Sequence, residues 1–554
     1  MTVEAVLQSP LVKLFPEEGP QSPEYSAFSA LPGEVASFQV AYRGDNPRRE
    51  DCRVRVASAL APYLRVRGVE LSPSAYPCHL ETDDFYLRTT PGLYPDYLKE
   101  LPNGRVGLIP GQWRCLWVDV ELPEEISPGG YEVTLCFETL EEGALLAGCS
   151  AKLEVKGAPL PKQRLIHTEW FYSDCLADYY RVPPLSEAWW GIVANYIETA
   201  AKRGVNMILT PTFTPALDTA QGAERTTVQL VEVFKNKDAY AFGFDRLKRW
   251  IDLCHAKGVE YIEMAHLFTQ WGAKAAPKVM AWEKGEQRRI FGWDTPATGE
   301  AYAGFLRQYL PALLGVLRQW GVLEKTYFHI SDEPSHEHLE SYLAAKEVVA
   351  EALEGCHIID ALSDFAFYEQ GVVECPVPSN DRIGPFLEHN VKPLWTYYCT
   401  AQAVKVSNRF FAMPSLRNRI LGVQLYCFGL QGFLHWGYNF YNSALSRELI
   451  HPFAVTDAQG VYPSGDAFLV YPNADGTAGE SIRLMVLFHA LQDMRAFALL
   501  ESLAGRDFVL SLVNEGLEKP IAFDEYPKDD AYLLALRERV NQEIALRVGS
   551  AGSL

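Results

Sequence analysis

Two neighbouring carboxylic acids, Asp332 and Glu333, are the residues of this 554-residue chain best placed by type and spacing to do chemistry. They end the stretch TYFHISDEP, in which β-branched and aromatic residues predict a short buried strand. Pro334 follows, and because proline disfavours helical geometry in the residue before it, we expect Glu333 to be extended. Two acids at a strand end could transfer protons.

The same residues could instead begin a helix. Ser335 would then be the N-cap, and the acidic side chains would be stabilised by the positive end of the helix dipole. The local sequence supports both readings equally, so the rest of the chain must decide between them.

The elements that would position the two acids follow from the hydrophobic pattern. From residue 167 onward, short apolar runs alternate with longer helical patterns, which indicates βα units around a parallel sheet. Eight strands can be assigned, the number that a (β/α)8 TIM barrel requires. The predicted strands are 165–170, 206–210, 261–265, 326–331, 357–360, 372–376, 393–398 and 432–436.

The predicted fold is a multidomain α/β protein in three parts. Residues 1–160 contain short alternating strands between Pro/Gly turns, which is typical of an antiparallel β-sandwich. Residues 161–504 would form the barrel, with long insertions at 211–243 and 267–300. Residues 505–554 would form an extension with an apolar strand, DFVLSLV, and a helix, used for packing or for a homo-oligomer.

Composition and charge exclude several kinds of partner. A net charge of −20 without a basic cluster argues against nucleic acid and anionic membranes. The N-terminus lacks a signal-peptide pattern and no apolar run could span a bilayer, so we expect a soluble, cytoplasmic protein. The 11 cysteines include no C-x-x-C pair, which fits a reducing compartment better than disulfides or zinc.

Polar and aromatic residues recur at the predicted strand ends, where a barrel would bring them together. Acids surrounded by Trp and Tyr, without a phosphate loop or a metal motif, indicate a sugar site with no cofactor and no metal. The candidates for substrate binding are Glu169, Trp170, His266, Asp364, Trp395, Tyr397, Trp436, Tyr438 and Asn439.

Adjacency restricts the mechanism open to Asp332 and Glu333. Ordinary glycosidases place two carboxyls across the scissile bond, about 5 Å or about 6.5–9.5 Å apart, whereas neighbours on a strand point to opposite faces. The pair better fits substrate assistance, in which a 2-acetamido oxygen attacks the anomeric carbon. Asp332 would hold the amide N–H, and Glu333, its pKa raised by Asp332, would protonate the leaving oxygen.

Several motifs, in order, resemble glycoside hydrolase family 123. They are TYFHISDEP, LWTYYCTAQ, the NRF of residues 408–410, GFLHWGYNFYNS and YPSGDAFLVYPN. The resemblance implies a β-sandwich followed by a (β/α)8 barrel, and an exo-acting retaining β-N-acetylgalactosaminidase that works through an oxazolinium. It also implies that Asp332 orients the acetamido group and that Glu333 is the acid/base.

The resemblance implies three further roles. Tyr397 or Tyr398 would donate a hydrogen bond to the acetamido carbonyl, with a slight preference for Tyr398 as a catalytic residue. Trp436 would line the pocket and Asn439 would bind a hydroxyl. The segment SIRLMVLFHALQDMRAF departs from the family pattern, which marks a distant member whose substrate can differ.

Two alternatives remain open on the sequence. The first is a conventional glycosidase, with Glu333 as acid and Glu169 or Glu263 as nucleophile, whose activity would be indifferent to the acetamido group. The second is a non-catalytic glycan-binding barrel, which would bind glycans without hydrolysing them. The choice of GalNAc over GlcNAc rests on the resemblance alone.

Overall fold

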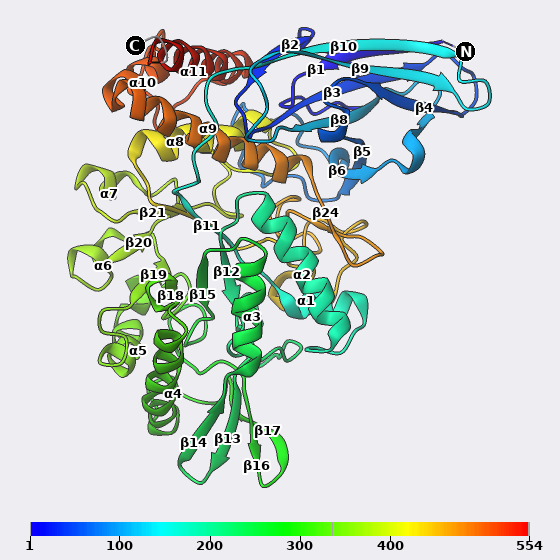
Figure 1. The fold of residues 1–554 in the computed structure, drawn as a ribbon. Helices are drawn as coiled ribbons and strands as arrows, with labels where there is room; N and C mark the ends of the chain where they lie inside the picture. The colour runs from blue at the N-terminus through cyan, green and yellow to red at the C-terminus, as the bar shows by residue number, and fades with distance from the viewer. Residues whose placement is uncertain (1, 335, 552–554) are drawn as a thin grey trace. The chain divides into compact units, whose positions relative to one another are not determined.

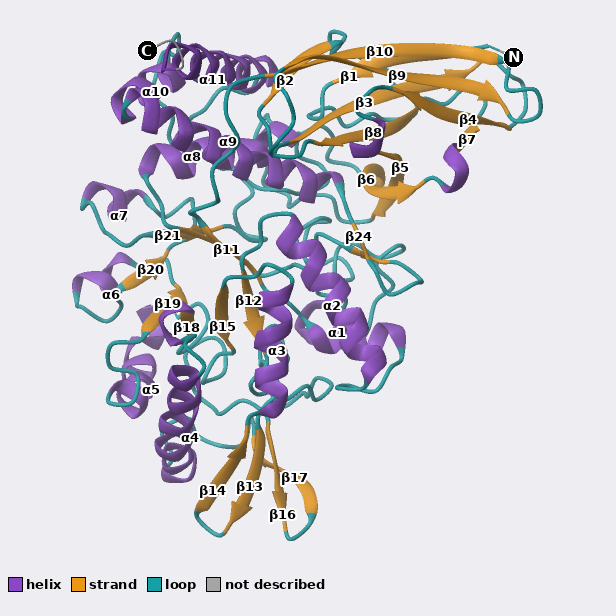
Figure 2. Cartoon of the chain, in the orientation of Figure 1, coloured by secondary structure: helices purple, strands orange, loops and turns teal. Residues whose placement is uncertain are grey.

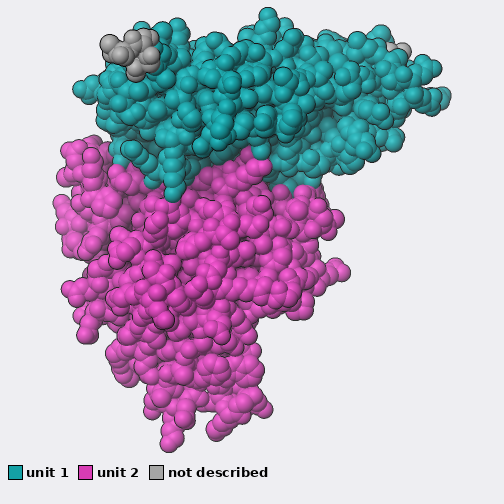
Figure 3. Space-filling view, in the orientation of Figure 1, with its two compact units in different colours: residues 1–164, 403–429, 479–554 teal, residues 165–402, 430–478 magenta. Residues whose placement is uncertain are grey.

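The structure is a computed structural model that describes residues 2–334 and 336–551; Ser335, the possible helix cap, lies outside the described residues. The chain divides into two compact units, coloured teal and magenta in Figure 3. They do not follow the chain linearly. Unit 1 comprises 1–164, 403–429 and 479–554, and unit 2 comprises 165–402 and 430–478.

Unit 2 contains an eight-stranded parallel sheet that nearly closes into a barrel (Figures 1 and 2). Its strand order is β20-β19-β18-β15-β12-β11-β22-β21. Hydrogen bonds from Asn380 N to Tyr397 O (2.8 Å) and from Tyr397 N to Pro378 O (3.1 Å) join its two ends. The strands are β11 (Ile166–Glu169), β12 (Met207–Thr210), β15 (Tyr261–Met264), β18 (Thr326–Phe328), β19 (His357–Ala361), β20 (Cys375–Val377), β21 (Trp395–Tyr397) and β22 (Gly432–His435).

Each of the eight predicted strands is therefore present. Every residue of β11, β12 and β22 is buried, as expected for parallel strands covered on both faces. Of the three, β12 (MILT) reads as a mostly apolar run, whereas β11 (IHTE) buries polar side chains inside the barrel.

Helices follow the strands of unit 2 from β11 to β20. They are α1 (Ser173–Tyr180), α2 (Glu187–Lys202), α3 (Asp245–Ala256), α4 (Glu300–Gln319), α5 (Leu339–Ala350), α6 (Phe365–Glu369) and α7 (Gly384–Glu388). The helices after β21 and β22 are α8 (Ser415–Phe428) and α9 (Ile482–Ala504), and both belong to unit 1. Helices α2, α3, α4, α5, α8 and α9 account for the longer helical patterns of the sequence, whereas α1, α6 and α7, of five to eight residues, are too short to establish a helical period.

Both predicted insertions contain a β-hairpin, and the two hairpins join in one four-stranded sheet (Figure 1). Its strands are β13 (Glu232–Asn236), β14 (Ala239–Gly243), β16 (Val279–Glu283) and β17 (Glu286–Phe291). Tyr240 and Phe242 of β14 pack against Phe305 of α4, with ring centroids 5.0 and 5.8 Å apart.

The N-terminal part of unit 1 forms two five-stranded sheets. One, in the order β1-β3-β8-β5-β6, contains β1 (Val3–Gln8), β3 (Val35–Gly44), β5 (Leu64–Ser74), β6 (Gly92–Glu100) and β8 (Arg114–Glu121). The other, in the order β2-β10-β9-β4-β7, contains β2 (Ala27–Ala30), β4 (Glu50–Ala57), β7 (Arg105–Leu108), β9 (Gly129–Thr139) and β10 (Leu145–Val155). Side chains of both sheets, including Phe38, Val118 and Phe137, share one core. Pairing is antiparallel except that β2 runs parallel to β10.

The C-terminal part of unit 1 is helical. DFVLSLV, expected to be a strand, lies instead in α10 (Arg506–Asn514), where Val509, Leu512 and Val513 are buried at helical spacing. It is followed by α11 (Asp530–Ala551). The short strands β23 (Tyr471–Pro472) and β24 (Ala478–Gly479), which come before α9 in the chain, pair with each other in a separate two-stranded sheet. None of the described helices has both the length and the apolar character needed to cross a bilayer.

Candidate active site

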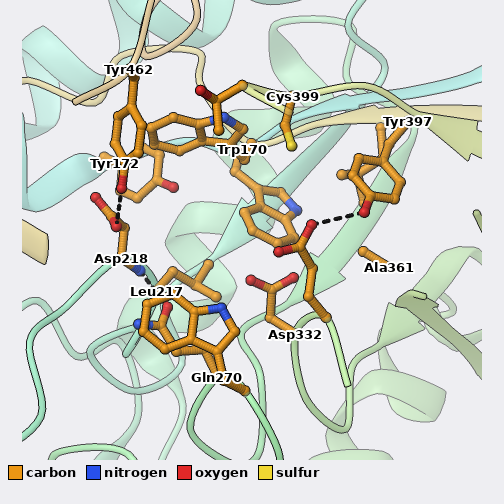
Figure 4. Close-up of a pocket in the computed structure, with 15 residues that line it drawn as sticks. Trp170, Tyr172, Leu217, Asp218, Gln270, Asp332, Ala361, Tyr397, Cys399 and Tyr462 are labelled. Atoms are coloured by element: carbon orange, nitrogen blue, oxygen red, sulfur yellow. Dashed lines mark hydrogen bonds between the residues drawn. The ribbon is translucent and has the colours of Figure 1, made fainter. Parts of the chain in front are cut away.

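A cavity of about 190 Å³ opens at the C-terminal ends of the barrel strands (Figure 4). Parallel barrels place their reactive side chains at this end. Its lining residues are Trp170, Tyr172, Leu217, Asp218, Gln270, Trp271, Asp332, Glu333, Ala361, Tyr397, Cys399, Thr400, Leu434, Trp436 and Tyr462.

Asp332 and Glu333 both line the cavity and are partly buried. The Tyr397 hydroxyl donates a 2.8 Å hydrogen bond to Glu333 Oε1, dashed in Figure 4. Asp332 is held through its backbone, because its carbonyl accepts a hydrogen bond from Trp271 N at 3.0 Å. The acids follow β18, and the described helical residues begin after them with a 3₁₀ turn at His336–His338 that leads into α5, so both acids lie outside the helix and in the wall of the cavity.

The position of Glu333 before proline predicted an extended backbone, and this prediction is wrong. The φ of Glu333 is 42°, and two other lining residues, Asp218 and Trp271, have φ of 40° and 56°. For residues other than glycine, a backbone in this left-handed region costs about 1–2 kcal/mol. Surrounding contacts must hold these residues in place, and such strain is typical of functional sites.

Burial raises the pKa of Asp332 well above its ordinary value, and repulsion from Glu333 raises it further. Burial also raises the pKa of Glu333, although the hydrogen bond from Tyr397 opposes that rise. Two interacting carboxyls titrate as a pair, so this pair keeps one proton at a pH where two isolated carboxyls would both be ionised.

The two tyrosines of the YYC motif have different surroundings. Tyr397 lines the cavity, whereas Tyr398 is fully buried against Phe433 and His435, with ring centroids 5.1 and 5.3 Å apart. The slight preference for Tyr398 as the tyrosine in the pocket is not met, because Tyr397 is the tyrosine of this motif that lines the cavity. Consecutive strand residues face opposite sides, so only one of the two could reach the cavity.

Trp170 and Trp436 line the cavity as expected, and each is fixed by a buried carboxylate. Trp170 Nε1 donates to Glu263 Oε1 at 2.8 Å, and Trp436 Nε1 donates to Asp466 Oδ2 at 3.0 Å. The indoles thus have defined orientations and present flat apolar faces of the kind that sugar rings contact.

Several predicted binding residues do not reach this cavity. The Tyr438 hydroxyl donates a hydrogen bond to Tyr196 O. The Asn439 side-chain amide accepts a hydrogen bond from Tyr172 N at 2.9 Å and donates one to Tyr172 O at 3.1 Å. Trp395 is buried beside Gly432 in the barrel wall. These three residues build the walls of the barrel rather than its opening.

The other three also have structural partners. Glu169 is buried with His167 (3.2 Å), and His266 is stacked on His329 below the opening. Asp364 caps α6 by accepting from Ala366 N at 3.0 Å. Polar side chains at buried strand ends often bond to other protein groups. A position at a strand end is therefore not enough to predict that a side chain contacts a ligand.

A second, wider cavity of about 670 Å³ adjoins the first. It is lined by Glu333, Pro334, Leu362, Ser363, Asp364, Phe365, Asp381, Arg382, Gly384, Pro385 and Tyr397. Glu333 and Tyr397 line both cavities, so the Glu333 carboxyl lies at the boundary between a small chamber and an open one.

Some lining residues were missed from the sequence, and they lie in long loops. Asp218 accepts a 2.6 Å hydrogen bond from the Tyr462 hydroxyl, dashed in Figure 4, and its amide donates to Gln270 Oε1 at 2.5 Å. Loops carry no periodic pattern, so nothing in the sequence distinguished these residues from their neighbours.

His266, His329 and Asp360 are the group nearest to a metal site among the described residues, with ligand atoms within 4.8 Å of one another. The two imidazoles are stacked, however, with centroids 4.1 Å apart and planes 16° apart. Imidazole lone pairs lie in the ring plane, so nearly parallel stacked rings cannot both direct one at an ion between them. This geometry does not suit a metal.

The family model for the glycoside hydrolase 123 catalytic domain matches residues 170–500. The barrel and its acidic cavity are those of a glycoside hydrolase, an enzyme that binds carbohydrate. Because the match covers more than half of the sequence, the chain belongs to glycoside hydrolase family 123.

Among solved structures, the chain is similar to a family 123 glycoside hydrolase from Clostridium perfringens, described in work on glycolipid glycan hydrolysis. The TM-score is 0.76 at 14% identity, over 100% of this chain and 99% of that one, which establishes a shared fold. β-Glucuronidase 2 of Bacteroides uniformis, in a calcium-binding mutant, matches with a TM-score of only 0.29 at 11% identity over 88% and 49% of the chains, respectively. No curated protein sequence matches the chain significantly.

Proposed function

We propose that this enzyme is an exo-acting, retaining β-N-acetylgalactosaminidase that uses substrate-assisted catalysis. The observation that carries the proposal is the carboxyl pair at one wall of a small chamber, with Tyr397 bonded to Glu333. Glu169 and Glu263, the alternative nucleophiles, do not line that chamber.

In the proposed reaction, the terminal sugar occupies the small chamber between Trp170 and Trp436. Its acetamido oxygen attacks the anomeric carbon as the glycosidic C–O bond breaks, and Glu333 gives its proton to the leaving oxygen. Asp332 accepts a hydrogen bond from the amide N–H and stabilises the oxazolinium, while Tyr397 donates to the acetamido oxygen. Glu333 then takes a proton from the water that opens the ring, so the anomeric configuration is retained.

The raised pKa values keep a proton on the acidic pair at a pH where isolated carboxyls would be ionised, and burial and repulsion raise the pKa of Asp332 the further of the two. A substrate amide N–H donating to Asp332 favours the carboxylate form of that residue, which leaves the shared proton on Glu333 beside the leaving oxygen. Activity should fall at low pH, when Asp332 is protonated, and at high pH, when Glu333 is ionised. Both limbs of the pH profile should lie above the ordinary carboxyl range of about 4.

The two cavities support exo action. A chamber of about 190 Å³ has room for a single sugar, and the leaving group would depart into the cavity of about 670 Å³ on the other side of Glu333. A glycolipid-type glycan is the proposed substrate, by analogy with the Clostridium perfringens enzyme.

A panel of aryl β-glycosides tests the proposal. Turnover should be high for GalNAc, lower for GlcNAc and absent for galactose and glucuronic acid, and a thiazoline that mimics the oxazolinium should inhibit. Glu333→Gln should lose about 10²–10⁴-fold in kcat, because it removes the proton donor. Equal turnover of galactose and GalNAc, or an active Glu333→Gln enzyme, would exclude this mechanism.

Asp218 motivates a second candidate, a conventional two-carboxylate glycosidase. Its carboxyl lines the chamber, and Figure 4 shows it on a different element from Asp332, as a nucleophile would require. In that case Asp218→Asn should abolish turnover while Asp332→Asn keeps it. Substrate assistance predicts the reverse order of severity.

We also propose the division of the chain into domains and the location of the enzyme in the cell. The two N-terminal sheets support a β-sandwich for 1–160, and the near-closed sheet supports a (β/α)8 barrel for 161–504, followed by the 505–554 extension. None of the 11 cysteines, all of which lie in the described residues, forms a disulfide, which supports action in the cytoplasm.

A further inference from the structure

A group of buried ionisable side chains lies within the barrel. Its histidine, His329, precedes Asp332 by three residues and contacts Trp170, which lines the same chamber as Asp332. His329 Nε2 is 2.6 Å from Glu263 Oε1, and His329 Nδ1 is 3.4 Å from Asp360 Oδ1. All three side chains are fully buried. Asp360 also accepts hydrogen bonds from Ile330 N (3.0 Å) and from the Tyr342 hydroxyl.

This group contacts the floor of the small chamber. Glu263 accepts the Trp170 N–H, and the His329 ring meets the Trp170 ring edge to face at 6.1 Å. His266 covers the other side of His329, and burial lowers the pKa of His266 well below its ordinary value, with repulsion from His329 acting in the same direction. His266 is therefore neutral, and the single positive charge of the group belongs to His329.

We propose that His329 is a positioning residue for catalysis: as an imidazolium held between Glu263 and Asp360, it keeps Asp332 ionised and so directs the proton of the acidic pair to Glu333. This inference rests on the proposed substrate-assisted function. His329 would be a third ionisable group of the active site, beside Asp332 and Glu333, and it lies three residues before Asp332 in the sequence.

The charges that face Asp332 support this role. Glu333, Asp360 and Asp218 all oppose its ionisation, and His329 is the residue that favours it. Burial opposes the charge on His329, but the carboxylates of Asp360, 3.4 Å from Nδ1, and Glu263, 2.6 Å from Nε2, outweigh it and raise the pKa of His329 to about 9. Without the His329 cation, Asp332 would face only the acids Glu333, Asp360 and Asp218. Asp332 would then compete with Glu333 for the proton that the pair shares.

His329→Gln tests the inference through the pH profile of kcat/KM on an aryl β-GalNAc. Removing the cation raises the pKa of Asp332, so the acidic limb should move to higher pH by about one unit or more. Tyr342→Phe is the matched control, because it removes a hydrogen bond to Asp360 without changing a charge, and its acidic limb should coincide with that of the wild type. Glu263→Gln keeps an acceptor for Trp170 but lowers the pKa of His329, so it should lose activity only at alkaline pH.

Two measurements separate the outcomes. Circular dichroism melts show whether each variant folds, and ¹⁵N-histidine NMR, with His329→Gln used for assignment, follows the His329 charge directly. We expect His329 to stay protonated in the wild type up to a pH of about 9. A neutral His329 at pH 7, or a folded His329→Gln enzyme with an unmoved acidic limb, would overturn the inference, whereas a wild type inactive on GalNAc would overturn the proposed function instead.

Discussion

Tyr397 and Tyr398 are neighbours with separate environments. Tyr397 bonds to Glu333 in the chamber, and Tyr398 packs against Phe433 in the barrel wall. Tyr397→Phe should lower kcat/KM for an aryl β-GalNAc by about 10–100-fold, because a hydrogen bond to charged groups contributes about 1.5–3 kcal/mol. Tyr398→Phe should change the melting temperature more than it changes kcat.

Steady-state kinetics and thermal melts on both variants check this prediction. If Tyr398→Phe lost more kcat/KM than Tyr397→Phe, the assignment of the catalytic tyrosine would have to be reversed. Equal, small losses in both variants would mean that neither phenol acts on the acetamido group.

The sequence could locate only part of the site. Trp170 and Trp436 directly follow β11 and β22, and Asp332 and Glu333 come four and five residues after β18, so the strand pattern was enough to find them. The choice within the YYC motif depends on register, which a shift of one residue reverses. Asp218 and its loop partners depend on long-range packing that no local pattern encodes.

At the scale of elements, β21 and β22 depend on a close approach at Gly432. A Cβ added there would lie 1.9 Å from Trp395 Cδ2 in the neighbouring strand. Gly432→Ala should therefore destabilise the protein by about 1–3 kcal/mol or more, because the indole is fully buried and cannot retreat.

Denaturant unfolding measures this effect, and Gly191→Ala is the control. Gly191 lies in the exposed part of α2, and a Cβ there meets nothing within 4 Å. Alanine should stabilise that helix by about 0.5–1 kcal/mol. A Gly432→Ala protein as stable as the wild type would show that the strands can separate without cost.

The elements themselves were predicted to different degrees. Strands of the barrel were found because short runs rich in apolar, β-branched and aromatic residues alternate with longer helical patterns, and α2, α3 and α4 were found because they are long enough to show a period. The pairing of β13 with β16 could not be predicted, since it joins Phe234 to Trp282 across two separate insertions. Helix α10 was mistaken for a strand because its apolar residues were read as one run.

At the scale of the whole molecule, unit 1 is assembled from distant segments. One core contains Trp117 of β8, Leu416 of α8, Met485 of α9 and Leu536 of α11. Arg483 of α9 forms a buried ion pair with Asp96 of β6 at 2.9 Å. The linear division predicted from composition could not anticipate this, because partners hundreds of residues apart leave no local signal.

A chain that starts at residue 165 should therefore fold poorly, even though it keeps every lining residue of the small chamber. It would lack Asp96, the ion-pair partner of Arg483, and it would lack Trp117, so the apolar side chains of α8, α9 and α11 that share a core with Trp117 would be exposed to water. We expect aggregation and no cooperative unfolding transition by calorimetry, where the full chain shows one or more. A soluble, active 165–554 fragment would contradict this.

The left-handed backbone at Glu333 has a consequence for heat tolerance. The φ of 42° suits asparagine better than glutamate, and the neighbouring acid is an unfavourable companion for any second carboxylate. Glu333→Asn should thus melt at a higher temperature than the parent protein while being catalytically dead. A substitution at position 333 would then raise the melting temperature while abolishing turnover. Selection for thermostability alone would be expected to replace Glu333.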